Sequence, residues 1–277
     1  MSPPTDSTFV PDLDGYFARI GYAGSREPTL AVLDAITFAH AAAIPFENGD
    51  VLLGKGISLD PAVVERKLVH ERRGGYCFEQ NGHLLRVLQA LGFEVTPLGA
   101  RVRWQRPRDV VPPRTHLFLQ VTIEGAPWFT DVGTGGLSLT SAVPFDGSGR
   151  ELTTRHESRR YVCEDGRWFH QVRIGQEWQD VYEFTGEIMH PIDCEVANWF
   201  TSAHPLSHFR TRLMVARATA DGRVTLLNDE VTRRRGTNVE TVRIRDADAL
   251  LEVLREDFGL TFPAGTRFGP PGSPWPS

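Results

Sequence analysis

The sequence predicts an α+β fold built from three consecutive parts. Helical periodicity dominates residues 1–92, short strand-like runs fill residues 93–190, and residues 191–277 combine strands with a further helix. Strands this close together in the sequence favour antiparallel pairing, because parallel strands need long crossovers. With 277 residues, of which 40% are hydrophobic, the chain can bury a substantial core.

The first part begins with three helical patterns. A short amphipathic pattern lies at residues 16–20, and a stronger one spans residues 29–43. Asp60 and Pro61 are typical of the N-cap and the first position of a helix. We therefore expect a third helix from there to about residue 70.

The middle part alternates apolar and polar residues between turn signals. The strand-like runs are residues 93–102, 116–121, 128–132, 161–163, 168–174 and 178–184. A tight turn at residues 124–125 would make a hairpin in which Phe118 pairs with Asp131. The short spacing of all these runs predicts an antiparallel sheet or barrel.

The last part returns to a mixed pattern. Residues 211–216 and 224–227 are strand-like, and a helix is expected after Asp246. That helix carries apolar residues on one side, namely Leu250, Leu251, Leu254 and Phe258.

Cys77 follows a Gly-Gly pair, at the expected start of a helix that stops at Gly92. Unpaired backbone N–H groups and the positive end of the helix dipole favour the thiolate, which is the nucleophilic form of cysteine. The dipole contributes only about 0.3–1 kcal/mol. The thiol therefore needs a cationic partner, which is normally a histidine.

His116 is the better of two candidate partners. His83 lies six positions along the same helix from Cys77, about a turn and a half away. The predicted hairpin places His116 on the same face as Asp131, one diagonal away, whereas a register shifted by one residue would separate them. The pattern therefore predicts Cys77 as the nucleophile, His116 as the base and Asp131 as the group that orients the imidazole.

Each of these residues also has an ordinary structural explanation. A lone helical cysteine is usually a small buried hydrophobe, and an aspartate at the end of a strand is commonly a turn former. A strand histidine is more often a core or surface residue than a base. If there were no shared site, all three ordinary explanations would have to apply at once. One site formed by the three residues is the simpler explanation.

Residues 72–81, with the sequence R-R-G-G-Y-C-F-E-Q-N, resemble the active-site signature of the arylamine N-acetyltransferases. Other matching segments follow in the order of that family: residues 44–48, 113–116, 131–133, 195–199 and 204–205 with 207–210. The resemblance implies that Cys77, His116 and Asp131 form a catalytic triad. It also implies a helical domain with the nucleophile (1–92), a β-barrel domain with His and Asp (93–190) and an α/β lid (191–277), with a core like that of the cysteine proteases.

The resemblance further implies a double displacement. Cys77 takes an acyl group, usually acetyl, from acetyl-CoA as co-substrate, and an arylamine or arylhydrazine then attacks the thioester. Six residues match substrate-binding positions of the family: Phe46, Tyr76, Thr115, Gly133, Thr134 and Phe209.

Two residues depart from the family pattern. Thr134 stands where the family usually has an aromatic residue, in Asp-Val-Gly-Phe-Gly, and Cys194 stands where many relatives have another aromatic. We expect Thr134 to widen the site and to add a hydroxyl. Both changes spare the triad, so they bear on selectivity rather than on the type of reaction.

Three alternatives stay open. An amide synthase of a polyketide or other natural-product pathway would use the same triad on an acyl chain held by an acyl carrier protein. A cysteine hydrolase would use water as the acceptor. A binding module would have kept the scaffold without catalysis.

Composition limits the remaining possibilities. The net charge of −5 argues against nucleic acid as a partner, and no apolar run approaches the length that spans a membrane. Three cysteines without paired spacing indicate reduced thiols and a cytoplasmic enzyme. No metal is expected, because His204 and His208 are separated by Pro205 and lack a third ligand.

Overall fold

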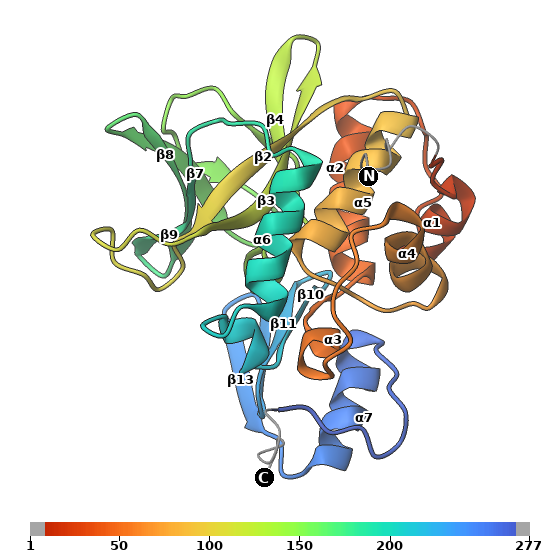
Figure 1. Ribbon diagram of the computed structural model, residues 1–277. Coiled ribbons are helices and arrows are strands. Elements are labelled where there is room, and N and C mark those ends of the chain that lie inside the picture. The colour runs from red at the N-terminus through yellow and green to blue at the C-terminus, as the bar shows by residue number, and fades with distance from the viewer. Residues whose placement is uncertain (1–8, 270–277) are drawn as a thin grey trace.

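The computed structural model describes residues 9–269. A bundle of helices lies beside a curled antiparallel sheet, and a second sheet with its own helix lies below both (Figure 1). This arrangement confirms the predicted α+β class. The outer ends of the predicted parts 1–92 and 191–277 fall outside the described residues.

The helical bundle follows the predicted order. Its elements are α1 (Leu13–Ile20), α2 (Leu30–Ala43), α3 (Gly49–Leu52), α4 (Pro61–Glu65) with the π-helical turn η1 (Arg66–His70), and α5 (Cys77–Ala90). Asp60 caps α4 as predicted, because its carboxylate accepts from the backbone N–H groups of Ala62 and Val63. After α5 the chain turns at Gly92, whose φ of +87° suits a residue without a side chain.

The eight-stranded sheet curls into a near-closed barrel. Its strands are β2 (Glu94–Val102), β3 (Arg114–Ile123), β4 (Ala126–Thr130), β5 (Val143–Pro144), β6 (Leu152–Thr153), β7 (Ser158–Glu164), β8 (Arg167–Ile174) and β9 (Glu177–Phe184), in the order β5-β4-β3-β2-β9-β8-β7-β6. All neighbours are antiparallel. The six predicted runs correspond to β2, β3, β4, β7, β8 and β9, and the two-residue strands β5 and β6 were not predicted.

The hairpin between β3 and β4 has the predicted register. Ile123 pairs with Ala126, and the ladder ends at Leu119 and Thr130, one position before Phe118 and Asp131. Both turn residues, at positions 124 and 125, have positive φ, as a two-residue hairpin turn requires. The hairpin therefore sets which face of the sheet His116 and the residue after β4 share.

The second sheet joins distant segments. Its order is β1 (Phe46–Glu47), β10 (Met214–Ala218), β11 (Gly222–Leu227), β12 (Glu230–Arg235) and β13 (Asn238–Arg243), and α7 (Ala247–Phe258) follows. Strand β1 comes from the first part of the chain and pairs with β10. The strand predicted at residues 211–216 begins only at Met214, because Thr211 still closes the 3-10 turn η3 (His208–Arg210) by donating its N–H to the carbonyl oxygen of His208.

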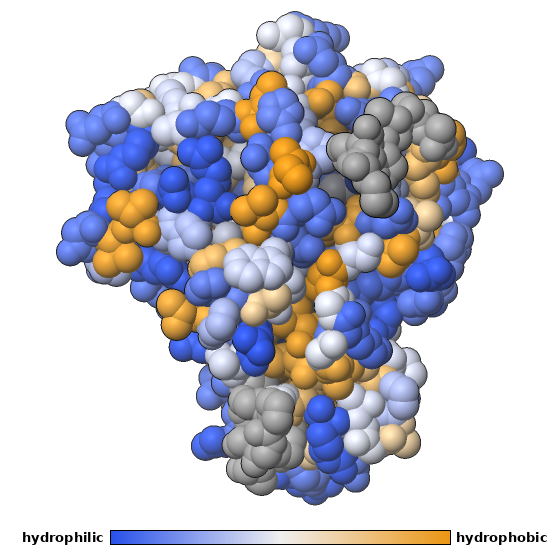
Figure 2. Space-filling model, viewed as in Figure 1, coloured by the Kyte–Doolittle hydropathy of each residue, from blue (hydrophilic) through white to orange (hydrophobic). Residues whose placement is uncertain are grey.

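Helix α6 (Pro191–Ala203) was not predicted. Its apolar residues Ile192, Val196 and Trp199 point outward and are 69%, 64% and 58% exposed, whereas the buried face includes Ala197 and Asn198. Figure 2 shows apolar side chains exposed over this helix. A helix is predicted from the sequence when its apolar residues recur on one buried face. In α6 the large apolar residues are exposed instead, so this signal was missing.

Candidate active site

Cys77 is the first residue of α5 and is only 5% exposed. The carboxylate of Glu79 accepts from the backbone N–H of Tyr76 at 3.0 Å, which closes the start of the helix. The Cys77 Sγ lies 3.6 Å from the carbonyl oxygen of Thr115 on β3. The predicted nucleophile thus faces the barrel from the end of a helix in the bundle.

A buried network of charged side chains fixes the segment that leads into α5. Arg73 pairs with Glu47 at 2.6 Å and with Asp50 at 3.1 Å. Lys67 bridges Asp50 at 2.9 Å and Glu79 at 2.6 Å. Because Glu79 lies in the first turn of α5, this network holds the backbone on both sides of the nucleophile.

His116 and Asp131 meet as predicted. The Nε2 atom of His116 lies 2.7 Å from Oδ2 of Asp131, and the two residues are 2% and 0% exposed. The side chain of Cys77 also acts on His116, because it favours the charged form of the imidazole and helps to raise its pKa. Three side chains from α5, β3 and the end of β4 therefore form one connected group.

The surroundings of His116 and Asp131 favour the charged form of both side chains. Burial opposes the charged form of His116, but the Asp131 carboxylate outweighs it and raises the pKa of His116 to about 10. Burial also opposes the charge of Asp131, but the charge of His116 and hydrogen bonds from several donors lower its pKa. The pair is therefore an imidazolium and a carboxylate at neutral pH.

Asn81 joins the two halves of the site, and sequence reasoning missed it. Its Nδ2 donates to Oδ1 of Asp131 at 2.8 Å and to the carbonyl oxygen of Leu117 at 2.7 Å. Its Oδ1 accepts from the backbone N–H of Val132 at 3.0 Å. The one available signal was its position a helical turn after Cys77, on the same face of α5.

The loop after β4 approaches α5 closely. A Cβ atom at Gly133 would lie 2.5 Å from Cα of Cys77, so a side chain cannot be accommodated there without movement. The N–H of Gly133 donates to Oδ1 of Asp131 at 3.0 Å, and the hydroxyl of half-buried Thr134 donates to Oδ2. Thr134, predicted to bind substrate, thus directs its hydroxyl to Asp131.

Three aromatic residues that were predicted to bind substrate lie together. The Tyr76 and Phe209 rings are 5.5 Å apart, and those of Phe46 and Phe209 are 6.2 Å apart. Tyr76 is fully buried and its hydroxyl donates to Asn198 on α6. Phe46 and Phe209 are half-buried at the edge of the apolar cluster that contains Cys77, so they are the more accessible pair.

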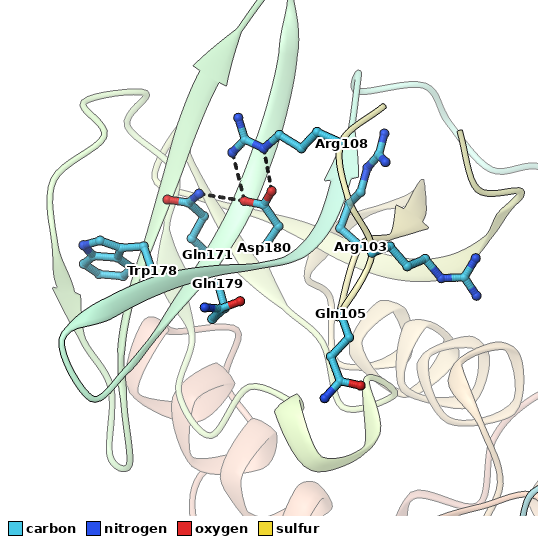
Figure 3. Close-up of a pocket in the computed structure, with 8 residues that line it drawn as sticks. Arg103, Gln105, Arg108, Gln171, Trp178, Gln179 and Asp180 are labelled. Atoms are coloured by element: carbon cyan, nitrogen blue, oxygen red, sulfur yellow. Dashed lines mark hydrogen bonds and ion pairs between the residues drawn. The ribbon is translucent and has the colours of Figure 1, made fainter. Parts of the chain in front are cut away.

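A separate pocket of about 260 Å³ lies on the barrel, between β8, β9 and the segment after β2 (Figure 3). Arg108 pairs there with Asp180 at 2.6 Å, and Gln171 donates to Asp180 at 2.6 Å. Arg103 pairs with Glu183 at 2.8 Å. Two of its three arginines, Arg103 and Arg108, thus have carboxylate partners within the protein, and none of Cys77, His116 and Asp131 lines it.

Neither a metal centre nor a membrane span appears in the described part of the chain. Within residues 9–269, no three His, Cys, Asp or Glu side chains are grouped so that they can hold a metal ion. No helix in the same range is long and apolar enough to cross a membrane.

Comparisons with known proteins identify the family. A family model described as N-acetyltransferase matches residues 29–266. The arylamine N-acetyltransferase of Mycolicibacterium smegmatis is 42% identical over 90% of this chain and 92% of that protein.

Solved structures agree with the family match. The structure of arylamine N-acetyltransferase from M. tuberculosis has a TM-score of 0.87 and 40% identity, over 90% of this chain and 93% of that one. The Mycobacterium marinum enzyme in complex with CoA has a TM-score of 0.86 and 38% identity, over 90% and 92% of the two chains. The chain is therefore an acyltransferase that belongs to the arylamine N-acetyltransferase family.

Proposed function

We propose that the protein transfers an acetyl or other short acyl group from acyl-CoA, acetyl-CoA above all, to an arylamine or arylhydrazine through a thioester on Cys77. The observation that carries this proposal is the connected group of Cys77, His116 and Asp131, with 2.7 Å between Nε2 of His116 and Oδ2 of Asp131. An imidazolium next to a thiol is the arrangement that makes cysteine nucleophilic. The match to an enzyme solved in complex with CoA supports acetyl-CoA as the donor.

In the first step the Cys77 thiolate attacks the carbonyl carbon of the donor thioester. The bond from that carbon to the sulfur of CoA breaks, and the departing sulfur takes the proton of the His116 imidazolium. The products are acyl-Cys77, free CoA and a neutral imidazole. Asp131 holds the imidazole in the orientation that delivers this proton.

In the second step the amine nitrogen attacks the acyl-Cys77 carbonyl. The bond to the Cys77 sulfur breaks, and neutral His116 accepts a proton from the nitrogen. The Cys77 thiolate and the His116 imidazolium are thereby restored, and the amide leaves. One base thus serves both half-reactions.

We propose that Phe46 and Phe209 receive the flat ring of the acceptor, with Tyr76 as the buried support beneath Phe209. The half-buried edge they form borders the cluster around Cys77, which supports this placement. The carbonyl oxygen of Thr115 lies 3.6 Å from the Cys77 sulfur, and the backbone of Gly133 packs against Cα of Cys77. The side chain of Thr134 turns to Asp131, which supports a wider site than an aromatic residue would leave.

Because CoA is anionic, the acyl-CoA donor needs a basic surface on the protein. We propose that this basic surface lies next to Phe209. Burial, Arg106 and Arg212 lower the pKa of His208, so positive charge gathers at this edge. We expect Arg212→Ala to raise the KM for acetyl-CoA more than the KM for the amine. Equal effects on both KM values would place the phosphates of CoA elsewhere.

Mass spectrometry of the intact protein tests the proposal. After exposure to acetyl-CoA, wild type and the control Cys163→Ser, altered at an exposed cysteine on β7, should each gain one acetyl group. Addition of an arylamine should remove it, and Cys77→Ser should gain none. An acetyl group on Cys77→Ser would contradict covalent catalysis by Cys77.

The same experiment separates the alternatives. Loss of the acetyl group to water as fast as to amines would indicate a hydrolase. Transfer from an acyl carrier protein without any transfer from acetyl-CoA would indicate an amide synthase, which the comparisons do not support. A cytoplasmic location stays a prediction from the cysteine content.

A further inference from the structure

The side chain of Thr134 makes a contact that its place in the sequence did not suggest. Its hydroxyl donates to Oδ2 of Asp131, the same oxygen that accepts from Nε2 of His116 at 2.7 Å. The backbone N–H of Thr134 donates to Oγ of Ser138 at 3.0 Å, and the N–H of Leu139 donates to the carbonyl oxygen of Asp131 at 2.7 Å. The loop is therefore closed on itself and keeps the hydroxyl against the carboxylate.

The other oxygen of Asp131 is held independently. Oδ1 accepts from Nδ2 of Asn81 at 2.8 Å and from the N–H of Gly133 at 3.0 Å. Asp131 is 0% exposed, so water does not compete for these positions. Because two donors already fix Oδ1, the carboxylate keeps its place when Thr134 is changed, and the change acts on the charge at Oδ2.

We propose that Thr134 is a positioning residue, which shares Oδ2 of Asp131 with His116 and thereby weakens the hold of the carboxylate on the imidazole proton. A donor to an ionised carboxylate takes part of its negative charge, so less remains to stabilise the imidazolium. In the proposed reaction, on which this role rests, His116 then releases its proton more readily to the departing sulfur of CoA. The aromatic residue of the family pattern has no hydroxyl, so this contact belongs to the departure at Thr134.

Other titratable or charged groups also face the pair of His116 and Asp131, from α5, β7, β8 and β9. They are Cys77, Tyr161, His170 and Tyr182, and Arg159 acts on the last three of these. Burial and then Arg159 lower the pKa of His170, and burial raises the pKa values of both tyrosines, so these three groups stay neutral near pH 7. These three groups do not titrate in the range in which His116 loses its proton, so a shift of that transition reports on the hydroxyl of Thr134.

Titration of His116 by NMR, with nitrogen-15 in the histidine rings of the full chain, tests the role of Thr134. Thr134→Val keeps the shape of the side chain and removes the hydroxyl. We expect it to move the alkaline transition of the His116 ring upward by about half a pH unit. The control Thr134→Ser keeps the hydroxyl and should titrate like wild type.

A second variant protects the test against a local change of packing. Thr134→Phe introduces the residue of the family pattern, also lacks the hydroxyl, and should shift the transition in the same direction as Thr134→Val. An unchanged or lowered transition in folded Thr134→Val would overturn the proposal, as would an equal shift in Thr134→Ser. Since the titration follows His116 directly, it decides the role of Thr134 even for a protein in which Cys77 takes no acetyl group.

Discussion

Two buried histidines in the bundle are neutral at pH 7, whereas the buried His116 of the barrel is positively charged. In the bundle, His40 and His83 are 0% and 1% exposed, and burial lowers the pKa of each to about 3. His116 in the barrel is 2% exposed, yet its pKa rises to about 10, because the Asp131 carboxylate outweighs the same burial. Burial is nearly equal in the three cases, so the neighbouring carboxylate decides the charge.

The same comparison separates His83 and His116, the two candidate partners of Cys77. His83 shares α5 with Cys77, but its ring packs against Tyr16 at 5.4 Å in the core of the bundle. Neither ring nitrogen has a hydrogen-bond partner among the described residues. A neutral, unpartnered imidazole cannot stabilise a thiolate, whereas a charged one on a distant strand can.

Replacing His116 should lower the rate of acetyl transfer more than any other change, whereas replacing His83 should hardly affect it. We expect His116→Ala to lower the rate of acetyl transfer by about 10⁴-fold or more, because both proton transfers are lost. The matched change His83→Phe removes two unpartnered nitrogens from the core and should leave the rate within about twofold of wild type. Steady-state assays of both variants check this, and a comparable loss in His83→Phe would break the comparison.

Removing the charge of Asp131 should have the next largest effect. Asp131→Asn keeps the size of the side chain but deprives His116 of the anion that outweighs burial. We expect a loss of about 10³- to 10⁴-fold, as in other triads, together with a fall in the pKa of His116. A pH–rate profile is the measurement, and a profile like that of wild type would show that Asp131 does not set the charge of His116.

The close approach between the bundle and the barrel should also be sensitive. We expect Gly133→Ala to lower the rate by about tenfold or more and stability by about 1–3 kcal/mol, because its Cβ would meet Cα of Cys77. On α5 itself, a Cβ at Gly82 meets only the flexible end of Arg86 at 3.7 Å, so Gly82→Ala should be neutral or stabilising by up to about 1 kcal/mol. Thermal melts and rates of acetyl transfer should be measured for both variants. Equal melting temperatures and rates for Gly133→Ala and Gly82→Ala would contradict the close packing of Gly133 against Cys77.

The variant His83→Phe should change activity least, but it should change how the free energy of unfolding depends on pH. His83 has a lowered folded pKa, so its contribution is complete above about pH 6.5 and is lost as the pH falls towards 3, by up to about 1.4 kcal/mol per pH unit. His116 has a raised folded pKa, so its contribution is complete below about pH 6.5 and is lost as the pH rises through about 10. Denaturant unfolding of His83→Phe should therefore show a flatter acid limb and an unchanged alkaline limb. An acid limb as steep as that of wild type would contradict a neutral buried His83.

The sequence carried the information that brings His116 to Asp131. Residues 124–125 could form a tight turn, the alternation on either side set the register, and that register put both side chains on one face. The Gly-Gly pair before Cys77 marked the start of α5 in the same way. Local rules of turns and pairing were sufficient for these features.

Other features depended on contacts that local rules do not describe. Asn81 is an amide with no chemistry of its own, and its role follows from α5 lying against β3. Helix α6 was missed because its apolar stripe faces outward. Strands β12 and β13 were missed because polar residues dominate them, and all six residues of β13 are exposed.

The charge of His116 and its effect on Cys77 form the central claim, and a comparison of cysteine alkylation rates at pH 6 tests it most directly. The rate of iodoacetamide reaction is followed separately at Cys77 and at the exposed Cys163 by peptide mass spectrometry. We predict that Cys77 is alkylated much faster than Cys163 at pH 6, although Cys163 is the more exposed of the two. Equal rates at the two cysteines at this pH would contradict an imidazolium at His116 that activates Cys77.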